Sequence, residues 1–260
     1  MDRVRARWAR VVAYLRGAPA TLVYTFTVVV TWYSAAAASP GLERRLLESE
    51  STNLHNMAHE PLQVLVSSAF WIDSPVFPVL TTGGLLAVMV PAERALGTRR
   101  WLAVFVAGHV IASVLTVVGI AVGIRQGLLP ARISGTTDVG VSYGAAAVAG
   151  CALHLLSRRG LRWSALGVLV VGLGAFAVVD HTFTDIGHLL ALGVGLLSWP
   201  LVKRWLRRAA PAARITTAPI TTAPSSPDGL REVGGEEPQD AAPGVLGRRL
   251  VVSEAGEPHH

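Results

Sequence analysis

Six apolar segments, separated by short polar turns, fill most of the first 208 residues and constrain the fold more than any other feature of the sequence. They cover roughly residues 18–38, 76–90, 101–124, 139–156, 163–179 and 184–202. A helix needs about 20 apolar residues to cross the hydrocarbon core of a bilayer, and most of these segments approach that length. Charged residues make up 15% of the chain, whereas a typical soluble domain carries about 25%. The sequence therefore predicts an all-α polytopic membrane protein with six transmembrane helices.

The basic residues gather at the ends of these segments. Clusters of arginine and lysine lie within residues 3–16, 94–100, 158–162 and 203–208, and the intervening polar stretches are less basic. Cytoplasmic loops of membrane proteins carry the excess of Lys and Arg. With six spans, this pattern predicts a multi-pass plasma-membrane protein with cytoplasmic N- and C-termini. Residues 1–17 form its basic N-terminus, and residues 18–208 form its membrane domain.

Residues 209–260 differ from the rest, being rich in Pro, Ala, Thr, Ser, Gly and Glu with few aromatic side chains. Such a segment cannot bury enough apolar area to fold, so we expect a disordered cytoplasmic tail. The net charge of +6 comes largely from the topology clusters. No basic patch is interleaved with aromatic residues, so no nucleic-acid partner is expected.

Three local features bear on disulfides, metal sites and the first loop. Cys151 is the only cysteine, which excludes an internal disulfide and a thiolate metal site. His55 and His59 are four residues apart but lack a third ligand, so no metal is expected. The apolar stretch 61–71 is too short to span and predicts a re-entrant or interfacial piece.

One serine and one histidine stand at matching places in two apolar segments. Ser142 lies near the start of the fourth segment and His188 near the start of the sixth. With six spans both segments enter the membrane from the outer face, so the two residues are expected at similar depth. A serine becomes nucleophilic when a base within hydrogen-bond reach takes its proton, and histidine is the usual base. A structural alternative is that Ser142 bonds a backbone carbonyl and His188 lines a wet cavity.

Several neighbours are candidates for supporting roles. Gly140 and Gly144 flank the serine and would let helices approach closely. Asp185, three residues before His188, could orient its imidazole, or Thr184 or Asp185 could cap the sixth helix. Asp138 could likewise cap the fourth.

The chain resembles the rhomboid intramembrane serine proteases at several ordered motifs. These are Gly140-Val141-Ser142 in the fourth segment, Gly187-His188 followed by glycines in the sixth, the stretch from Leu65 to Trp71, and the turn containing Glu93, Gly97 and Arg100. The resemblance covers roughly residues 18–208 and extends to the divergent rhomboid-like branch found in actinobacteria. It implies a rhomboid-like fold and a dyad of Ser142 as nucleophile and His188 as general base. It further implies transmembrane helices as substrates, cut near their outer ends, and no cofactor.

Two departures from the family pattern leave other hypotheses open. Tyr143 stands where the family has glycine, and Phe77 and Thr81 stand where it has a histidine and an asparagine that hold the oxyanion. Backbone amides near Ser142, or one of the loop residues His55, Asn56 and His59, could supply the missing donors. The alternatives are a pseudoprotease that binds client transmembrane helices without cutting them, and a small transporter. The transporter would use His109, His188 and Asp185 as a proton path.

Overall fold

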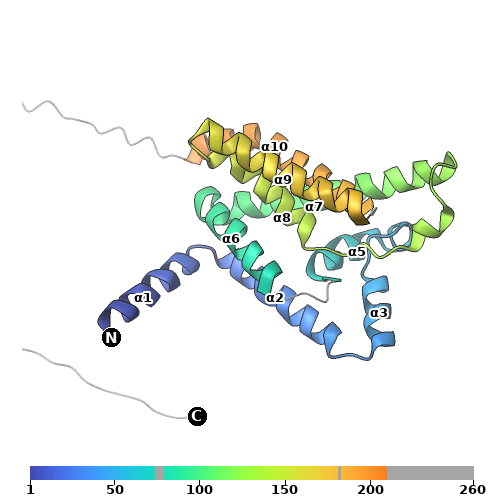
Figure 1. Ribbon diagram of the computed structural model, residues 1–260, viewed down its shortest axis with the longest axis horizontal. Helices are drawn as coiled ribbons and strands as arrows, with labels where there is room; N and C mark the ends of the chain where they lie inside the picture. The colour runs from blue at the N-terminus through green and yellow to red at the C-terminus, as the bar shows by residue number, and fades with distance from the viewer. Residues whose placement is uncertain (74–78, 181–182, 210–260) are drawn as a thin grey trace, which may run out of the picture. The chain divides into compact units, whose positions relative to one another are not determined.

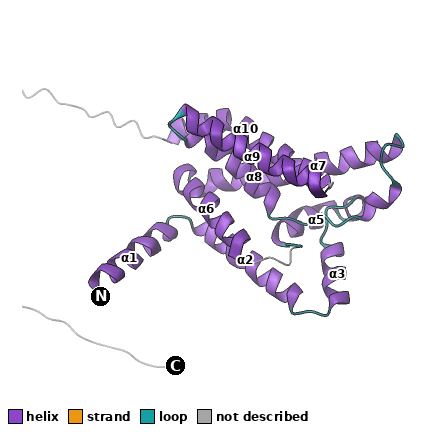
Figure 2. Cartoon of the chain, viewed as in Figure 1, coloured by secondary structure: helices purple, strands orange, loops and turns teal. Residues whose placement is uncertain are grey.

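The computed structural model describes residues 1–73, 79–180 and 183–209, and over these residues it consists of helices joined by loops (Figures 1 and 2). The long helices are α1 (Asp2–Arg16), α2 (Pro19–Ala36), α6 (Val79–Leu96), α7 (Thr98–Arg125), α8 (Ser142–Ala152), α9 (Arg159–Asp180) and α10 (Phe183–Ala209). Between α2 and α6 lie three short helices, α3 (Pro40–Ser49), α4 (Leu54–His59) and α5 (Pro61–Ser67). Single 3₁₀ turns, η1 (Ser68–Phe70), η2 (Ala131–Gly135) and η3 (Leu153–Leu155), complete the set. The predicted all-α class is confirmed.

Each predicted span corresponds to one helix, with shifted ends. The largest shifts are at two C-terminal ends: α10 was expected to end near residue 202 but continues to Ala209, and α6 was expected to stop before Pro91 but continues to Leu96. A proline is tolerated inside a helix of a membrane protein because neighbouring groups satisfy the freed carbonyl. Among the described helices, the α7 and α10 stretches Thr98–Arg125 and Thr184–Arg208 have the length and apolar character needed to cross a membrane, and Ser142–Leu155 is apolar but shorter. The count of six spans therefore stays a prediction.

The centre of the bundle is α8, which packs against both α7 and α10. Ala147 of α8 is fully buried between Gly108 of α7 and Gly195 of α10. A Cβ atom at Gly108 would collide with the Ala147 side chain, and one at Gly195 would collide with the Ala147 carbonyl. Small residues at these crossings let three backbones approach, as is typical of helix contacts inside membranes.

A buried carboxylate joins α6 to the start of α2. Glu93 is 1% exposed and accepts hydrogen bonds from the backbone N–H groups of Ala20 at 3.1 Å and Thr21 at 2.7 Å. The Thr98 hydroxyl donates a third bond at 2.7 Å. The first N–H groups of a helix lack partners within it, so Glu93 caps α2 from a distant part of the chain. Burial alone would raise the pKa of this carboxyl, but the hydrogen bonds from Thr98, Thr21 and Ala20 lower it below the usual value.

Large apolar side chains cover the outer surfaces of the bundle. In α2, for example, Val23 is 66% exposed and Phe26 is 70% exposed. In α9, Val168 is 72% exposed and Val171 is 70% exposed. Outward apolar residues of this kind recur along α7. Apolar patches of such extent on a soluble monomer would be unusual, whereas a lipid-facing surface requires them.

Candidate active site

Ser142 and His188 line one cavity of about 280 Å³ between α6, α8, α9 and α10. Ser142 is the first residue of α8 and is half-buried, while the His188 side chain on α10 is 16% exposed. The other described residues around this cavity are apolar or glycine: Gly84, Leu85, Val88, Val141, Ala145, Ala146, Ala149, Leu169 and Leu192. The structure therefore brings the two predicted residues to one apolar chamber. Within the described residues no hydrogen bond joins Ser142 Oγ to the His188 ring.

Ser142 is the first residue of a helix, so the backbone N–H groups that begin at Ser142 lack partners within that helix. The first bond that closes α8 runs from the Ala145 N–H to the Val141 carbonyl at 3.3 Å. The N–H groups of Ser142, Tyr143 and Gly144 precede this bond and have no carbonyl to pair with inside the helix. A helix N-terminus also carries partial positive charge, so negative charge that develops beside Ser142 is stabilised there.

His188 is held between a carboxylate and an aromatic ring. Its Nδ1 atom lies 3.9 Å from Asp185 Oδ1, an ion-pair contact too long for a hydrogen bond. The ring of Tyr143 meets the His188 ring edge-on, with centroids 5.1 Å apart and planes at 79°. Nδ1 is therefore the ring nitrogen on the side of the Asp185 carboxylate.

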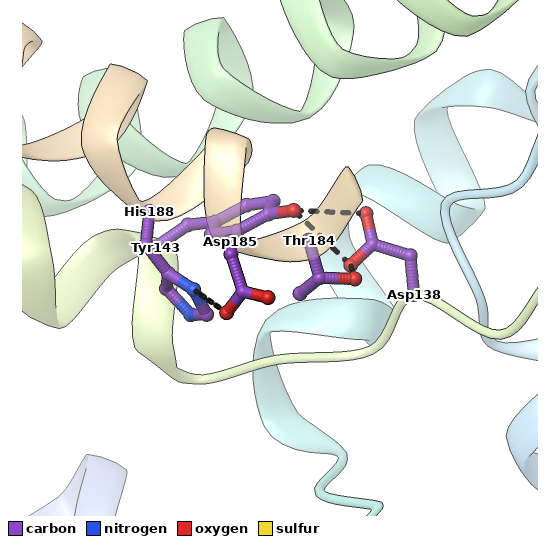
Figure 3. A network of polar contacts seen from close by, with 5 residues as sticks. All are labelled: Asp138, Tyr143, Thr184, Asp185 and His188. Atoms are coloured by element: carbon purple, nitrogen blue, oxygen red, sulfur yellow. Dashed lines mark hydrogen bonds and ion pairs between the residues drawn. The ribbon is translucent and has the colours of Figure 1, made fainter. Parts of the chain in front are cut away.

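The residue after the serine, Tyr143, belongs to a buried polar network centred on Asp138 (Figure 3). The Tyr143 hydroxyl donates to the two Asp138 carboxylate oxygens at 3.1 and 3.2 Å. Thr184, at the start of α10, donates to Oδ1 at 3.3 Å, and Thr52 of the first loop donates to Oδ2 at 3.1 Å. Burial, which raises the pKa of Asp138, outweighs these hydrogen bonds, which lower it, so the pKa lies above the usual value.

This network overturns one capping prediction. Asp138 does not cap α8, because the residue before that helix is Val141 and no side chain caps it. Instead the Asp138 carboxylate gathers three segments that are far apart in sequence. In α10 the helix begins at Phe183, so Thr184 and Asp185 lie inside its first turn rather than before it. Thr184 uses its hydroxyl for Asp138, and Asp185 places a negative charge where the helix dipole favours it.

The two glycines beside the serine fit close contacts. The Gly140 N–H donates to the Ser68 carbonyl at 3.0 Å, which ties the loop before α8 to η1. A Cβ atom at Gly140 would lie 2.8 Å from Ser142 Oγ, and one at Gly144 would collide with the Phe105 ring of α7. Larger residues at either position would displace the serine or its helix.

His109 is buried near this site but serves a different set of contacts. Its Nε2 atom lies 3.0 Å from the Leu65 carbonyl and 3.2 Å from Ser68 Oγ. The nearest link to Ser142 and His188 is the Tyr143 ring, whose centroid is 6.3 Å away. His109 thus fixes the stretch 61–71 against α7, and no chain of hydrogen bonds between described residues connects it to His188.

The first-loop residues suggested as oxyanion donors lie elsewhere. His55, Asn56 and His59 line a separate pocket with residues of α5, and none of them borders the cavity of Ser142. The Asn56 amide is already used, because it donates to the carbonyls of Glu48, Ser49 and Ser51. Of the family's oxyanion positions, Phe77 and the side chain of Thr81 fall outside the described residues. No group of three or more metal-ligating side chains occurs in the part of the chain that the structure describes.

Sequence reasoning missed the role of the Ser51-Thr52 pair. Both residues are buried, the Asp138 N–H donates to Ser51 Oγ at 2.6 Å, and the Thr52 N–H donates to the Asp138 carbonyl at 2.9 Å. In the sequence they stand in a polar, acidic loop that reads as solvent-exposed. The small polar run Ser51-Thr52-Asn53, free of charge amid glutamates, was the available signal.

Comparison with known proteins places most of the chain in one family. The model of a family described as rhomboid-like protein matches residues 13–208. No curated protein and no solved structure matches the chain. The matched region contains α2 through α10 almost entirely, and with them the whole cavity.

Proposed function

The chain belongs to the rhomboid-like protein family, a family of membrane proteins, and on that premise we propose that it is an intramembrane serine endopeptidase. In this proposal Ser142 is the nucleophile and His188 the general base, and peptide bonds of transmembrane proteins are hydrolysed. One observation carries it: of the described residues lining the cavity, Ser142 and His188 are the polar side chains. Six spans with both termini in the cytoplasm, and the actinobacterial branch, are the expectations that accompany it.

The chemistry proceeds by acyl transfer. Ser142 Oγ attacks the carbonyl carbon of the substrate while His188 Nε2 takes the hydroxyl proton. His188 then gives that proton to the leaving amine as the C–N bond breaks, which leaves an acyl group on Ser142. A water molecule, deprotonated by His188, attacks the acyl carbon. His188 returns that proton to Ser142 Oγ as the acyl C–O bond breaks, which releases the second product and restores the serine.

Neighbouring groups have defined tasks in this scheme. Asp185 stabilises the imidazolium through its contact with Nδ1. The N–H groups at the start of α8 bind the oxyanion, in place of the donors that the family carries at the positions of Phe77 and Thr81. Tyr143, held by Asp138, limits the rotation of the His188 ring through the edge-on contact.

The substrate class follows from the chamber walls. Apolar residues of four helices surround the serine, so a polar or charged segment would lose hydration on entry. An apolar segment near the end of a transmembrane helix enters without that loss. Partners are therefore transmembrane substrates together with the lipid bilayer, and no cofactor takes part.

Labelling with a fluorescent fluorophosphonate tests the proposal without knowledge of a substrate. The wild type in detergent should label, and Ser142→Ala should not. Ser198→Ala is the control: Ser198 lies in α10, its hydroxyl donates to the Gly195 carbonyl at 2.7 Å, and it does not line the cavity. Circular dichroism confirms folding of each variant. A folded wild type that fails to label would refute the dyad and support a pseudoprotease that binds helices without cutting them.

A further inference from the structure

The first helix, α1, is amphipathic, and its apolar face has no partner within the described chain. Val4, Trp8, Val11 and Leu15 follow the spacing i, i+4, i+7 and i+11, which places them on one side of a helix. No residue of α1 is buried, and Val4 is 59%, Trp8 66% and Val11 47% exposed. Figure 1 shows α1 leaving the bundle at the start of α2. A folded helix with this exposed stripe needs an apolar surface to cover it.

The charge on α1 indicates which surface that is. Five arginines, at positions 3, 5, 7, 10 and 16, accompany a single acidic residue, Asp2. On a helical wheel the arginines flank the apolar stripe on both sides, while Ala6, Ala9 and Ala13 occupy the opposite face. A basic helix with tryptophan on its apolar face is suited to the boundary between headgroups and acyl chains.

The corner between α1 and α2 sets the height of α1. The Arg94 guanidinium donates to the Tyr14 carbonyl at 2.8 Å and stacks over the Tyr14 ring at 4.3 Å. This contact fixes the last turn of α1 to the end of α6, where Glu93 caps α2. α2 begins its apolar run two residues beyond Gly17, so in the proposed six-span topology the corner lies where the first span leaves the membrane.

We propose that α1 is an interfacial helix that binds anionic phospholipid, with its apolar stripe among the acyl chains and its arginines at the phosphates. In the proposed topology this is the cytoplasmic leaflet, whose anionic lipids attract basic segments. The partner is the lipid surface itself rather than a soluble protein. This inference goes beyond the proposed function and holds equally for a protease and for a protein that only binds helices.

Fluorescent probes on opposite faces of α1 test the proposal in the full chain. Val11→Cys places a probe on the apolar stripe, and Ala9→Cys places one on the far face at nearly the same height. Cys151 is fully buried, so the unsubstituted chain serves as the labelling blank. The labelled proteins are reconstituted in nanodiscs of phosphatidylcholine with or without phosphatidylglycerol. Quenching by nitroxide lipids reports contact with lipid, and quenching by iodide reports contact with water.

With phosphatidylglycerol, the Val11 probe should be quenched by nitroxide lipid and the Ala9 probe by iodide. Changing Arg5, Arg7 and Arg10 to Gln should weaken the docking equilibrium about 100-fold, from about fivefold for each arginine. Omitting the phosphatidylglycerol should also weaken the docking of α1 on the lipid.

Three results would overturn the proposal. Iodide access to both probes would show that α1 projects into water. A Val11 probe shielded from both quenchers would show that protein covers the stripe. Lipid contact that is unchanged by the arginine substitutions and by lipid charge would show apolar insertion without recognition of anionic headgroups.

Discussion

The buried carboxylate of Asp138 offers a prediction whose size follows from its contacts. Asp138→Ala removes the acceptor for the hydroxyls of Tyr143 and Thr184. Thr52 keeps a partner, because its hydroxyl also lies 2.9 Å from the Asp138 backbone carbonyl. The buried Tyr143 hydroxyl loses its carboxylate acceptor, which costs about 1–3 kcal/mol, and the partly exposed Thr184 adds less. Relief of the buried charge offsets part of this, so we expect a loss of about 2 kcal/mol in the free energy of unfolding.

Two further variants separate the hydrogen bond from the rest of the network. Asp138→Asn keeps an acceptor for the Tyr143 hydroxyl and should cost at most about 1 kcal/mol. Tyr143→Phe removes the donor and leaves the ring against His188. The double variant Asp138→Ala with Tyr143→Phe lacks both the acceptor and the donor of this hydrogen bond. Its loss of unfolding free energy should therefore be smaller than the sum of the two single losses by about 1 kcal/mol or more. Unfolding by SDS in mixed micelles, followed by circular dichroism, measures each free energy. Additive losses would refute the coupling between the two side chains.

The same carboxylate gives the stability a pH dependence with a defined sign. Burial raises the pKa of Asp138 in the folded protein, so the folded state holds the proton more tightly than the unfolded chain does. This contribution is complete below the unfolded pKa of about 3.9 and is lost as the pH rises through the folded value. The lowered pKa of Glu93 acts in the opposite direction. Subtracting the Asp138→Asn curve from the wild-type curve cancels Glu93, and the difference should fall with rising pH; a flat or rising difference would contradict the assignment.

Three other predictions concern the bundle and the loop. Gly195→Ala should destabilise the protein by about 1–3 kcal/mol, because the added Cβ atom would collide with the Ala147 carbonyl. Gly193→Ala is the control and should not destabilise it, because no atom of the described residues lies near that position. Unfolding by SDS compares the two variants. Glu93→Ala should cost about 2 kcal/mol or more, since it leaves two backbone N–H groups at the start of α2 unpaired, and equal unfolding midpoints would contradict the capping role. His59→Ala should leave fluorophosphonate labelling within twofold of the wild type, because His59 lies outside the cavity; a loss of labelling would place the first loop at the site.

The sequence predicted those features that depend on local pattern. Apolar runs and flanking arginines located both ends of α7 and the start of α10 within three residues, because length and hydropathy are properties of a single segment. The positions of Ser142 and His188 near the starts of their apolar segments predicted that they lie close together, and both residues line one cavity.

Features that depend on distant contacts were beyond that reasoning. Thr52 and Asp138 are 86 residues apart, and neither residue carries a local mark of the hydrogen bond between them. Asp138 before a helix has the pattern of a cap, but the chain turns at Val141 and sends the carboxylate inward. Tyr143 stands next to Ser142 where the family has glycine, and nothing local in the sequence explains it. In the structure its hydroxyl donates to Asp138 and its ring packs edge-on against His188.

The central claim is that His188 activates Ser142, and mass mapping of the fluorophosphonate adduct tests it most directly. After digestion of the labelled wild type, the adduct should lie on the peptide containing Ser142. His188→Ala should slow its formation by about 100-fold or more, the scale of a lost general base. An adduct on a different residue, or equal labelling rates in the wild type and His188→Ala, would contradict the dyad.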